Sequence, residues 1–111
     1  MTDKLFLVEV TAGAKRDLDE IQDYLEVERS ASESDAFLAD FGRAARTPKQ
    51  FPLRGSVPRE LDALGIREFR QVMFGPYRVI YDVVGPNVFI MVVADGRRDM
   101  QSLLERRLLH R

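Results

Sequence analysis

The chain has no cysteine and no tryptophan, and its only histidine is His110, next to the last residue. The lack of cysteine excludes a disulfide-based scaffold, a thiolate-ligated metal site and a thiol nucleophile, and it fits a reducing compartment. A single histidine leaves too little for a metal site or a catalytic cluster built on imidazoles. Glycine and proline are also few, at 7 and 5 of 111 residues, so the composition is neither collagen-like nor disordered. We therefore expect a folded protein without cysteine or histidine chemistry.

A length of 111 residues corresponds to a single domain, residues 1–111, with one modest core. The first apolar run, residues 5–8, is too short for a signal peptide or a membrane span. We expect a cytoplasmic protein that does not contact a membrane.

The formal net charge of −1 hides an uneven distribution along the chain. Residues 1–40 carry 11 acidic and 4 basic side chains, a balance of −7. Residues 41–111 carry 7 acidic and 13 basic side chains, a balance of +6, and 12 of these bases are arginine. Arginine binds carboxylates and phosphates through a planar fork of donors, so the second part of the chain is the expected contact region for an anionic partner.

The N-terminal part shows the pattern of one strand followed by two amphipathic helices. Residues 4–10 are rich in β-forming side chains, and Thr11 is placed to cap a helix over residues 12–29. Residues 30–33 have the S-x-x-E pattern of a capping box, which predicts a second helix that is limited at its far end by Pro48. The short link between the two helices predicts an antiparallel hairpin. The apolar positions at helical spacing are Ala14, Leu18, Ile21 and Leu25 in the first helix, and Phe37, Leu38, Phe41, Ala44 and Ala45 in the second.

The C-terminal part shows the pattern of a three-stranded meander and a last helix. Residues 51–58 form a loop, the segment 59–66 is ambiguous, and strands are expected over 67–74, 77–84 and 87–94 with Gly-Pro turns between them. Both faces of the middle strand are largely apolar, so one covers the helices and the other needs a C-terminal element or a partner. Asp99 is placed to cap a helix with an apolar face. The expected fold is α+β, a small antiparallel sheet packed on an N-terminal helical hairpin in the order β-α-α-β-β-β-α.

This order, together with short motifs, resembles the RelE/ParE superfamily of toxins from type II toxin–antitoxin systems. The resemblance runs over nearly the whole chain. It implies a bacterial toxin encoded beside a small antitoxin, which binds it in a hetero-oligomer and holds it inactive, and it implies no cofactor and no metal. The segments that carry it are residues 77–81 (Y-R-V-I-Y), residues 95–99 (D-G-R-R-D), residues 14–24 in the first helix, residues 51–55 (F-P-L-R-G) and residues 69–72 (F-R-Q-V).

The superfamily divides by target. RelE-like members cleave mRNA on the ribosome, whereas ParE-like members act on DNA gyrase and lack the nuclease residues. Arg70, Arg78 and Arg98 match three basic positions of the RelE-like pattern. Two other positions of the pattern are not matched, because its second strand base falls near Val72 and its catalytic tyrosine falls near Leu104. The incomplete set and the long helical hairpin favour a ParE-like gyrase inhibitor rather than an enzyme.

Tyr77, Tyr81 and His110 remain as substitutes for the missing tyrosine, although none lies at the matching position. Asp95 and Asp99 are conceivable bases, but Asp99 is better explained as a helix cap. The two tyrosines are better explained by packing.

Four arginines are the predicted target-binding residues: Arg70, Arg78, Arg97 and Arg98. The alternatives are a ribosome-dependent mRNA endonuclease that uses Arg70, Arg78 and Arg98, with ribosome and mRNA as partners, and a binding module that has lost toxicity. A simpler alternative for Arg70 and Arg78 is a solvated sheet edge or an ion pair with Glu68 or Asp82.

Overall fold

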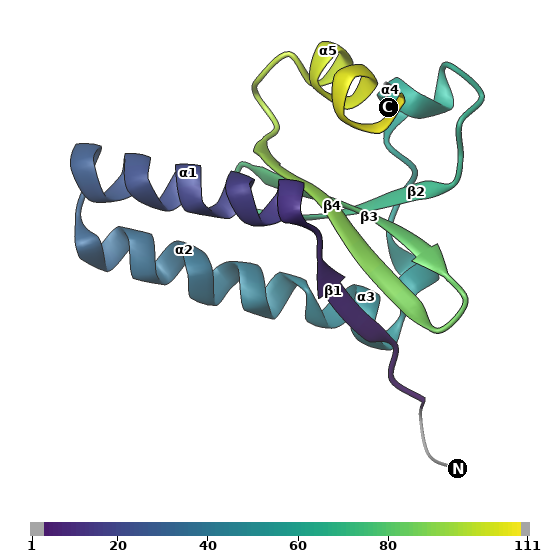
Figure 1. Ribbon diagram of the computed structural model, residues 1–111, viewed down its shortest axis with the longest axis horizontal. Coiled ribbons are helices and arrows are strands. Elements are labelled where there is room, and N and C mark those ends of the chain that lie inside the picture. Colours follow the sequence, from purple (N-terminus) through teal and green to yellow (C-terminus); the bar gives the residue numbers. More distant parts are fainter. Residues whose placement is uncertain (1–3, 110–111) are drawn as a thin grey trace.

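The computed structural model describes residues 4–109, and His110 lies outside this range. Its elements follow the predicted order, with short additional helices between the hairpin and the meander (Figure 1). The elements are β1 (Leu7–Val10), α1 (Ala12–Glu28), α2 (Ala31–Ala44), α3 (Arg46–Gln50), a 3₁₀ turn (Pro52–Arg54), α4 (Arg59–Asp62), β2 (Phe69–Phe74), β3 (Tyr77–Val84), β4 (Asn87–Asp95), α5 (Met100–Leu104) and a π-helical turn (Glu105–Leu109). The predicted α+β fold is confirmed.

The sheet has four strands in the order β1-β4-β3-β2. Its meander, β2 to β4, is antiparallel as expected, but β1 pairs with β4 in parallel, so the sheet is mixed. A parallel pair requires a long crossover between its strands. The whole helical hairpin and the meander's first two strands lie between β1 and β4, and they provide that crossover.

The predicted caps of the helical hairpin are confirmed. Thr11 accepts the backbone N–H of Ala14 at 3.4 Å, and Ser30 accepts that of Glu33 at 3.1 Å. The expected role of Pro48 is wrong, because α2 ends at Ala44 and Pro48 lies inside the separate helix α3. Proline is tolerated there because the first N–H groups of a helix have no partner within the helix.

The two faces of the sheet bury separate clusters of apolar side chains. One face packs against the helical hairpin, and the opposite face is covered by α4 and α5 (Figure 1). The expectation that a C-terminal element covers the second face is confirmed. The fully buried members are Ala14, Val79, Tyr81, Val88 and Ile90 on the hairpin side, and Leu61, Ile80, Val92 and Leu104 on the other side.

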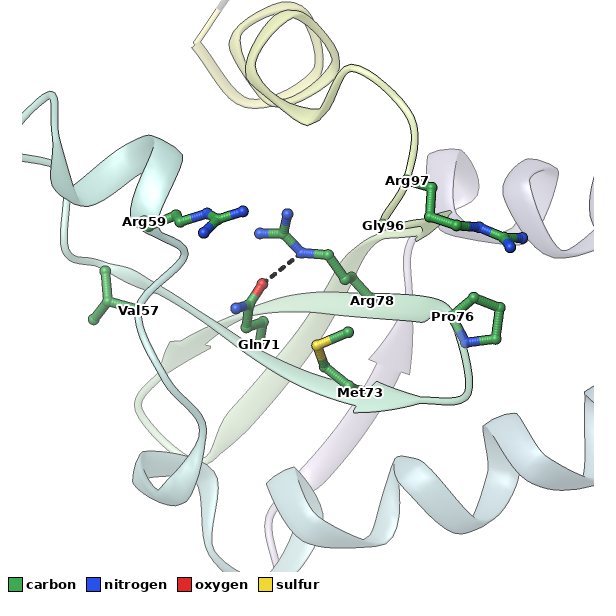
Figure 2. A pocket seen from close by; sticks show the side chains of 8 residues that line it. All are labelled: Val57, Arg59, Gln71, Met73, Pro76, Arg78, Gly96 and Arg97. Atoms are coloured by element: carbon green, nitrogen blue, oxygen red, sulfur yellow. Dashed lines mark hydrogen bonds between the residues drawn. The ribbon is translucent and has the colours of Figure 1, made fainter.

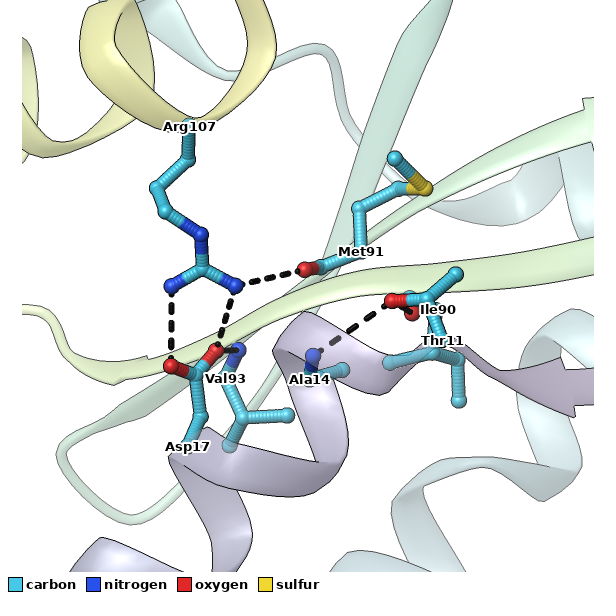
Figure 3. A network of polar contacts seen from close by, with 7 residues as sticks. All are labelled: Thr11, Ala14, Asp17, Ile90, Met91, Val93 and Arg107. Carbon is cyan, nitrogen blue, oxygen red and sulfur yellow. Dashed lines mark hydrogen bonds and ion pairs between the residues drawn. The ribbon is translucent and has the colours of Figure 1, made fainter.

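The end of the chain is attached to α1 and β4 by one polar network (Figure 3). Arg107 donates to the Asp17 carboxylate of α1 at 2.8 and 3.1 Å and to the carbonyl oxygen of Met91 at 3.1 Å. The same carboxylate accepts the backbone N–H of Val93 at 3.0 Å. β1 pairs with β4 only as far as Ile90, so the outer edge of β4 is open beyond this residue. The side chains of Asp17 and Arg107 bind the backbone groups of Val93 and Met91 that are exposed there.

Within residues 4–109, no helix is both long and apolar enough to cross a membrane. The same residues contain no group of three or more acidic, histidine or cysteine side chains that could hold a metal ion.

Candidate functional site

A pocket of about 460 Å³ lies between β2, β3, the start of α4 and the segment after β4 (Figure 2). Three arginines are among the residues that line it. The lining residues are Val57, Arg59, Gln71, Met73, Pro76, Arg78, Gly96 and Arg97. Two of the predicted target-binding residues, Arg78 and Arg97, therefore border one pocket.

Arg78 is buried at the floor of this pocket, with 6% of its surface exposed. Its two terminal nitrogens each donate to a carboxylate oxygen of Glu60 at 2.8 Å, and its Nε donates to the Gln71 side chain at 2.8 Å. Gly96 makes room for the aliphatic part of Arg78, because a Cβ at this position would lie 2.8 Å from the Cδ of Arg78. The guanidinium group is thus held in one orientation, and its charge is neutralised by Glu60 of α4.

The partner of Arg78 differs from both candidates in the sequence. Glu68 and Asp82 do not bind Arg78, and the bidentate carboxylate comes from Glu60, which lies in the ambiguous segment 59–66. Hydrogen bonding from Arg78 holds the pKa of Glu60 below its ordinary value. The pair is therefore ionised at neutral pH.

Protonation of Glu60 is expected to weaken the fold at low pH. A carboxyl with a lowered pKa in the folded state stabilises the fold above its ordinary pKa of 4.5, and this contribution is lost as the pH falls through the folded value. We expect the stability difference between the wild type and Glu60→Gln to be largest at pH 7 and to shrink steadily below pH 4.5. Urea unfolding of both proteins across this range measures it. A difference that is independent of pH would contradict the assignment of the proton to Glu60.

Arg70 lies on the opposite face of the sheet from Arg78. It is paired in register with Tyr81, whose side chain faces the helical hairpin, whereas Arg78 is paired with Met73. Its Nη1 donates to the carbonyl oxygens of Leu53 and Gly55 at 3.1 and 2.9 Å. Arg70 therefore holds the loop 51–58 against the sheet, and the structure does not bring Arg70, Arg78 and Arg98 into one site.

Arg97 and Arg98 lie on the exposed segment that follows β4. Arg97 donates to both oxygens of Asp95, at 2.9 and 2.6 Å, and this contact holds the pKa of Asp95 below its ordinary value. Arg98 makes no ion pair or side-chain hydrogen bond within residues 4–109. Asp99 caps α5 by accepting the backbone N–H of Ser102 at 3.1 Å, as predicted, and this hydrogen bond lowers its pKa.

Both tyrosines of β3 have structural roles. Tyr81 is fully buried and donates to the carbonyl oxygen of Pro52 at 2.6 Å. Tyr77 packs its ring against Phe37 and Phe74, with centroids 4.8 and 5.3 Å away. Burial raises the pKa of both hydroxyls, so both remain protonated at neutral pH.

Three residues of this region are absent from the sequence prediction: Arg59, Glu60 and Gln71. Arg59 and Glu60 lie in a four-residue helix, which is too short to produce a helical repeat of apolar positions. Gln71 alternates with Arg70 along β2, so its place beside Arg78 follows from the strand register rather than from any local motif.

Comparisons with known proteins agree with this architecture. The family model described as the ParE toxin of the type II toxin–antitoxin system parDE matches residues 8–100. A chain from the chromosomal ParDE system of P. aeruginosa superposes with a TM-score of 0.67 at 17% identity, over 81% of this chain and 95% of that chain. A chain from the RelBE2 toxin–antitoxin complex of Mycobacterium tuberculosis superposes with a TM-score of 0.54 at 23% identity, over 82% and 98%. The search of curated proteins gave no significant match.

Proposed function

Because the chain belongs to the ParE toxin family of type II toxin–antitoxin systems, we propose that it inhibits or poisons DNA gyrase and is neutralised by a cognate antitoxin. The observation that carries the choice of target is the state of Arg78. The guanidinium group of Arg78 is buried, its charge is neutralised by Glu60, and three of its five N–H donors are bound to Glu60 and Gln71, so it is poorly placed to bind a scissile phosphate.

The remaining chemistry also argues against an mRNA endonuclease. Attack by the 2′-hydroxyl of RNA needs a group that takes up a proton and a group that protonates the leaving oxygen. The carboxyls after β4, Asp95 and Asp99, have lowered pKa values and are engaged with Arg97 and with the start of α5. The hydroxyls of Tyr77 and Tyr81 have raised pKa values, so they are poor bases at neutral pH. An inhibitor that acts by binding requires none of these proton transfers.

Exposed apolar side chains support a protein partner. Leu7 and Leu53 are each 68% exposed, and an apolar groove of about 590 Å³ next to Leu53 is lined by Phe6 and Phe51. Surface of this kind is typical of a site that another protein covers. The two structural neighbours come from toxin–antitoxin systems, and we propose that an antitoxin covers this surface in a cytoplasmic hetero-oligomer.

Inhibition of gyrase is expected to depend on the arginines after β4. We expect the purified toxin to inhibit supercoiling of relaxed plasmid DNA, and Arg97→Ala/Arg98→Ala to raise the concentration for half-inhibition by roughly tenfold or more, since each tenfold corresponds to about 1.4 kcal/mol of lost binding. The matched control is Arg16→Ala/Arg46→Ala, which removes two exposed arginines elsewhere and should inhibit like the wild type.

Three outcomes decide against this proposal. If gyrase is unaffected at a large molar excess of toxin, the target is wrong. If primer extension on translated messages shows codon-dependent cuts that are lost in Arg78→Ala, the protein is a ribosome-dependent endonuclease. If expression without antitoxin leaves growth unaffected, the protein is a binding module without toxicity.

A further inference from the structure

A second cleft, of about 470 Å³, lies between the last turns of α1 and the adjoining ends of β3 and β4. Its walls carry three arginines: Arg29 at the end of α1, and Arg97 and Arg98 on the segment after β4. The first and last of these are exposed and make no ion pair or side-chain hydrogen bond within residues 4–109. Two of the cationic groups that line the cleft therefore have their side-chain donors available.

The charges that line the cleft leave a small positive excess. The acidic lining residues are Glu20 on α1 and Asp95, which is bound to Arg97. Three guanidinium groups against two carboxylates leave one positive charge. A single phosphodiester carries the opposite charge, and the fork of donors on arginine matches its oxygens.

The same cleft has aromatic walls. Tyr24 of α1 is 62% exposed, so its ring is accessible to a flat ligand. Tyr77 also lines the cleft and is held by its packing against Phe37 and Phe74, and its hydroxyl makes no hydrogen bond within the described residues. Burial and the nearby charge of Asp95 raise the pKa of Tyr77, whereas the charges of Arg97 and Arg29 lower it, and the net effect is an increase. The protonated hydroxyl is therefore a fixed donor among the arginines.

The cleft shares a lining residue with the pocket above Arg78. Arg97 lines both hollows, and Figure 2 shows its guanidinium group pointing away from Arg78. Beyond Arg97, Arg59 faces the first pocket and makes no ion pair within residues 4–109. An extended ligand with an anionic group at each repeat can thus contact Arg29 and Arg98 in one hollow and Arg59 in the next.

We propose that this pair of hollows binds a single strand of nucleic acid, with one phosphodiester between Arg29 and Arg98, its base against Tyr24 and the neighbouring phosphate toward Arg59. Alternating cationic and aromatic groups are the pattern that binds single strands with little sequence preference. The proposal goes beyond gyrase inhibition, because the toxin itself contacts the strand and does so without the target protein.

Fluorescence anisotropy with labelled oligothymidylate of about eight nucleotides tests the strand site on the full-length toxin. We expect saturable binding that weakens between about 50 and 200 mM salt. Arg29→Ala/Arg98→Ala should weaken it at least about tenfold and reduce the slope of log K against log salt by about 0.7, because one phosphate loses its cationic partners. Tyr24→Leu should weaken it about fivefold or more without changing this slope.

The control pair Arg16→Ala/Arg46→Ala should bind within about a factor of two of the wild type. Equal losses in the control pair, no binding at low salt, or equally effective competition by a polyglutamate peptide would each overturn the proposal. An oligouridylate arm shows whether the 2′-hydroxyl contributes, and a preference of more than about tenfold for either sugar would overturn the backbone-and-stacking mode. If the toxin binds the strand but does not inhibit gyrase, the strand site is supported and the gyrase target is refuted. If the toxin inhibits gyrase but does not bind the strand, the gyrase target is supported and the strand site is refuted.

Discussion

Replacing Glu60 with alanine is expected to destabilise the protein by about 3–5 kcal/mol. The change leaves the guanidinium group of Arg78 buried without its anionic partner, and its two terminal nitrogens lose both of their 2.8 Å hydrogen bonds. Removing one partner of a buried ion pair costs far more than the pair itself contributes, because the remaining charge stays out of water. The loss is a large fraction of the 5–15 kcal/mol by which domains of this size are usually stable.

Urea unfolding at neutral pH measures this effect, and the chain offers a matched control. Asp62, two residues further along, forms an ion pair with Arg67 in which the side chains are 47% and 70% exposed. Asp62→Ala should cost less than about 1 kcal/mol, because water screens that pair. Replacing both Glu60 and Arg78 with methionine should recover much of the loss. Similar losses for Glu60→Ala and Asp62→Ala would show that Arg78 is solvated after all.

Replacing Gly55 with alanine is expected to cost about 2–4 kcal/mol. A Cβ at this position would overlap the hydroxyl of Tyr81 and would lie 2.7 Å from the carbonyl oxygen of Gln71. Neither atom can yield, because the first belongs to a buried side chain and the second to the backbone of β2. The loop 51–58 would therefore have to move away from the sheet, which weakens the bond from Tyr81 to Pro52 and the bridge between Ser56 and Gln71.

The backbone conformation of Gly55 is not the cause, because its φ of −63° and ψ of 153° suit any residue. Gly42 on α2 is the matched control, since a Cβ there meets nothing within 4 Å. Gly42→Ala should stabilise the protein by about 0.5–1 kcal/mol, because it removes a flexible residue from a helix interior. Thermal unfolding of the two variants compares them directly. A Gly55→Ala protein as stable as the wild type would mean that the loop is not packed as described.

The local signals in the sequence were sufficient for most of the fold. Side chains at Thr11, Ser30 and Asp99 form hydrogen bonds with the backbone a few residues away, so the starts of three helices can be predicted from short patterns. Tyr81 and Arg78 are an odd number of positions apart along β3, and they lie on opposite faces of the sheet, as strand alternation requires. The parallel pairing of β1 with β4 could not be predicted in this way, because it depends on segments about 80 positions apart.

The candidate site was less accessible to sequence reasoning. The sequence draws attention to the arginine of β3, but it does not show that Arg78 is bound by Glu60, which comes from a short helix without a periodic pattern of its own. The resemblance assigns Arg70 and Arg78 to basic positions of one pattern, and only the register of β2 with β3 shows that they lie on opposite faces. No sequence pattern points to Arg29, because its place in the same cleft as Arg98 depends on how α1 packs beside the end of β4.

The contact between Asp17 and Arg107 joins positions 90 residues apart. During synthesis, this contact cannot form until Arg107 has left the ribosome. Until then the carbonyl of Met91 and the N–H of Val93 lack these partners, so a nascent or truncated chain presents an open strand edge on which chains can associate. The protection of this strand edge is therefore tied to Arg107, and a stop codon before it would leave a sheet prone to aggregation.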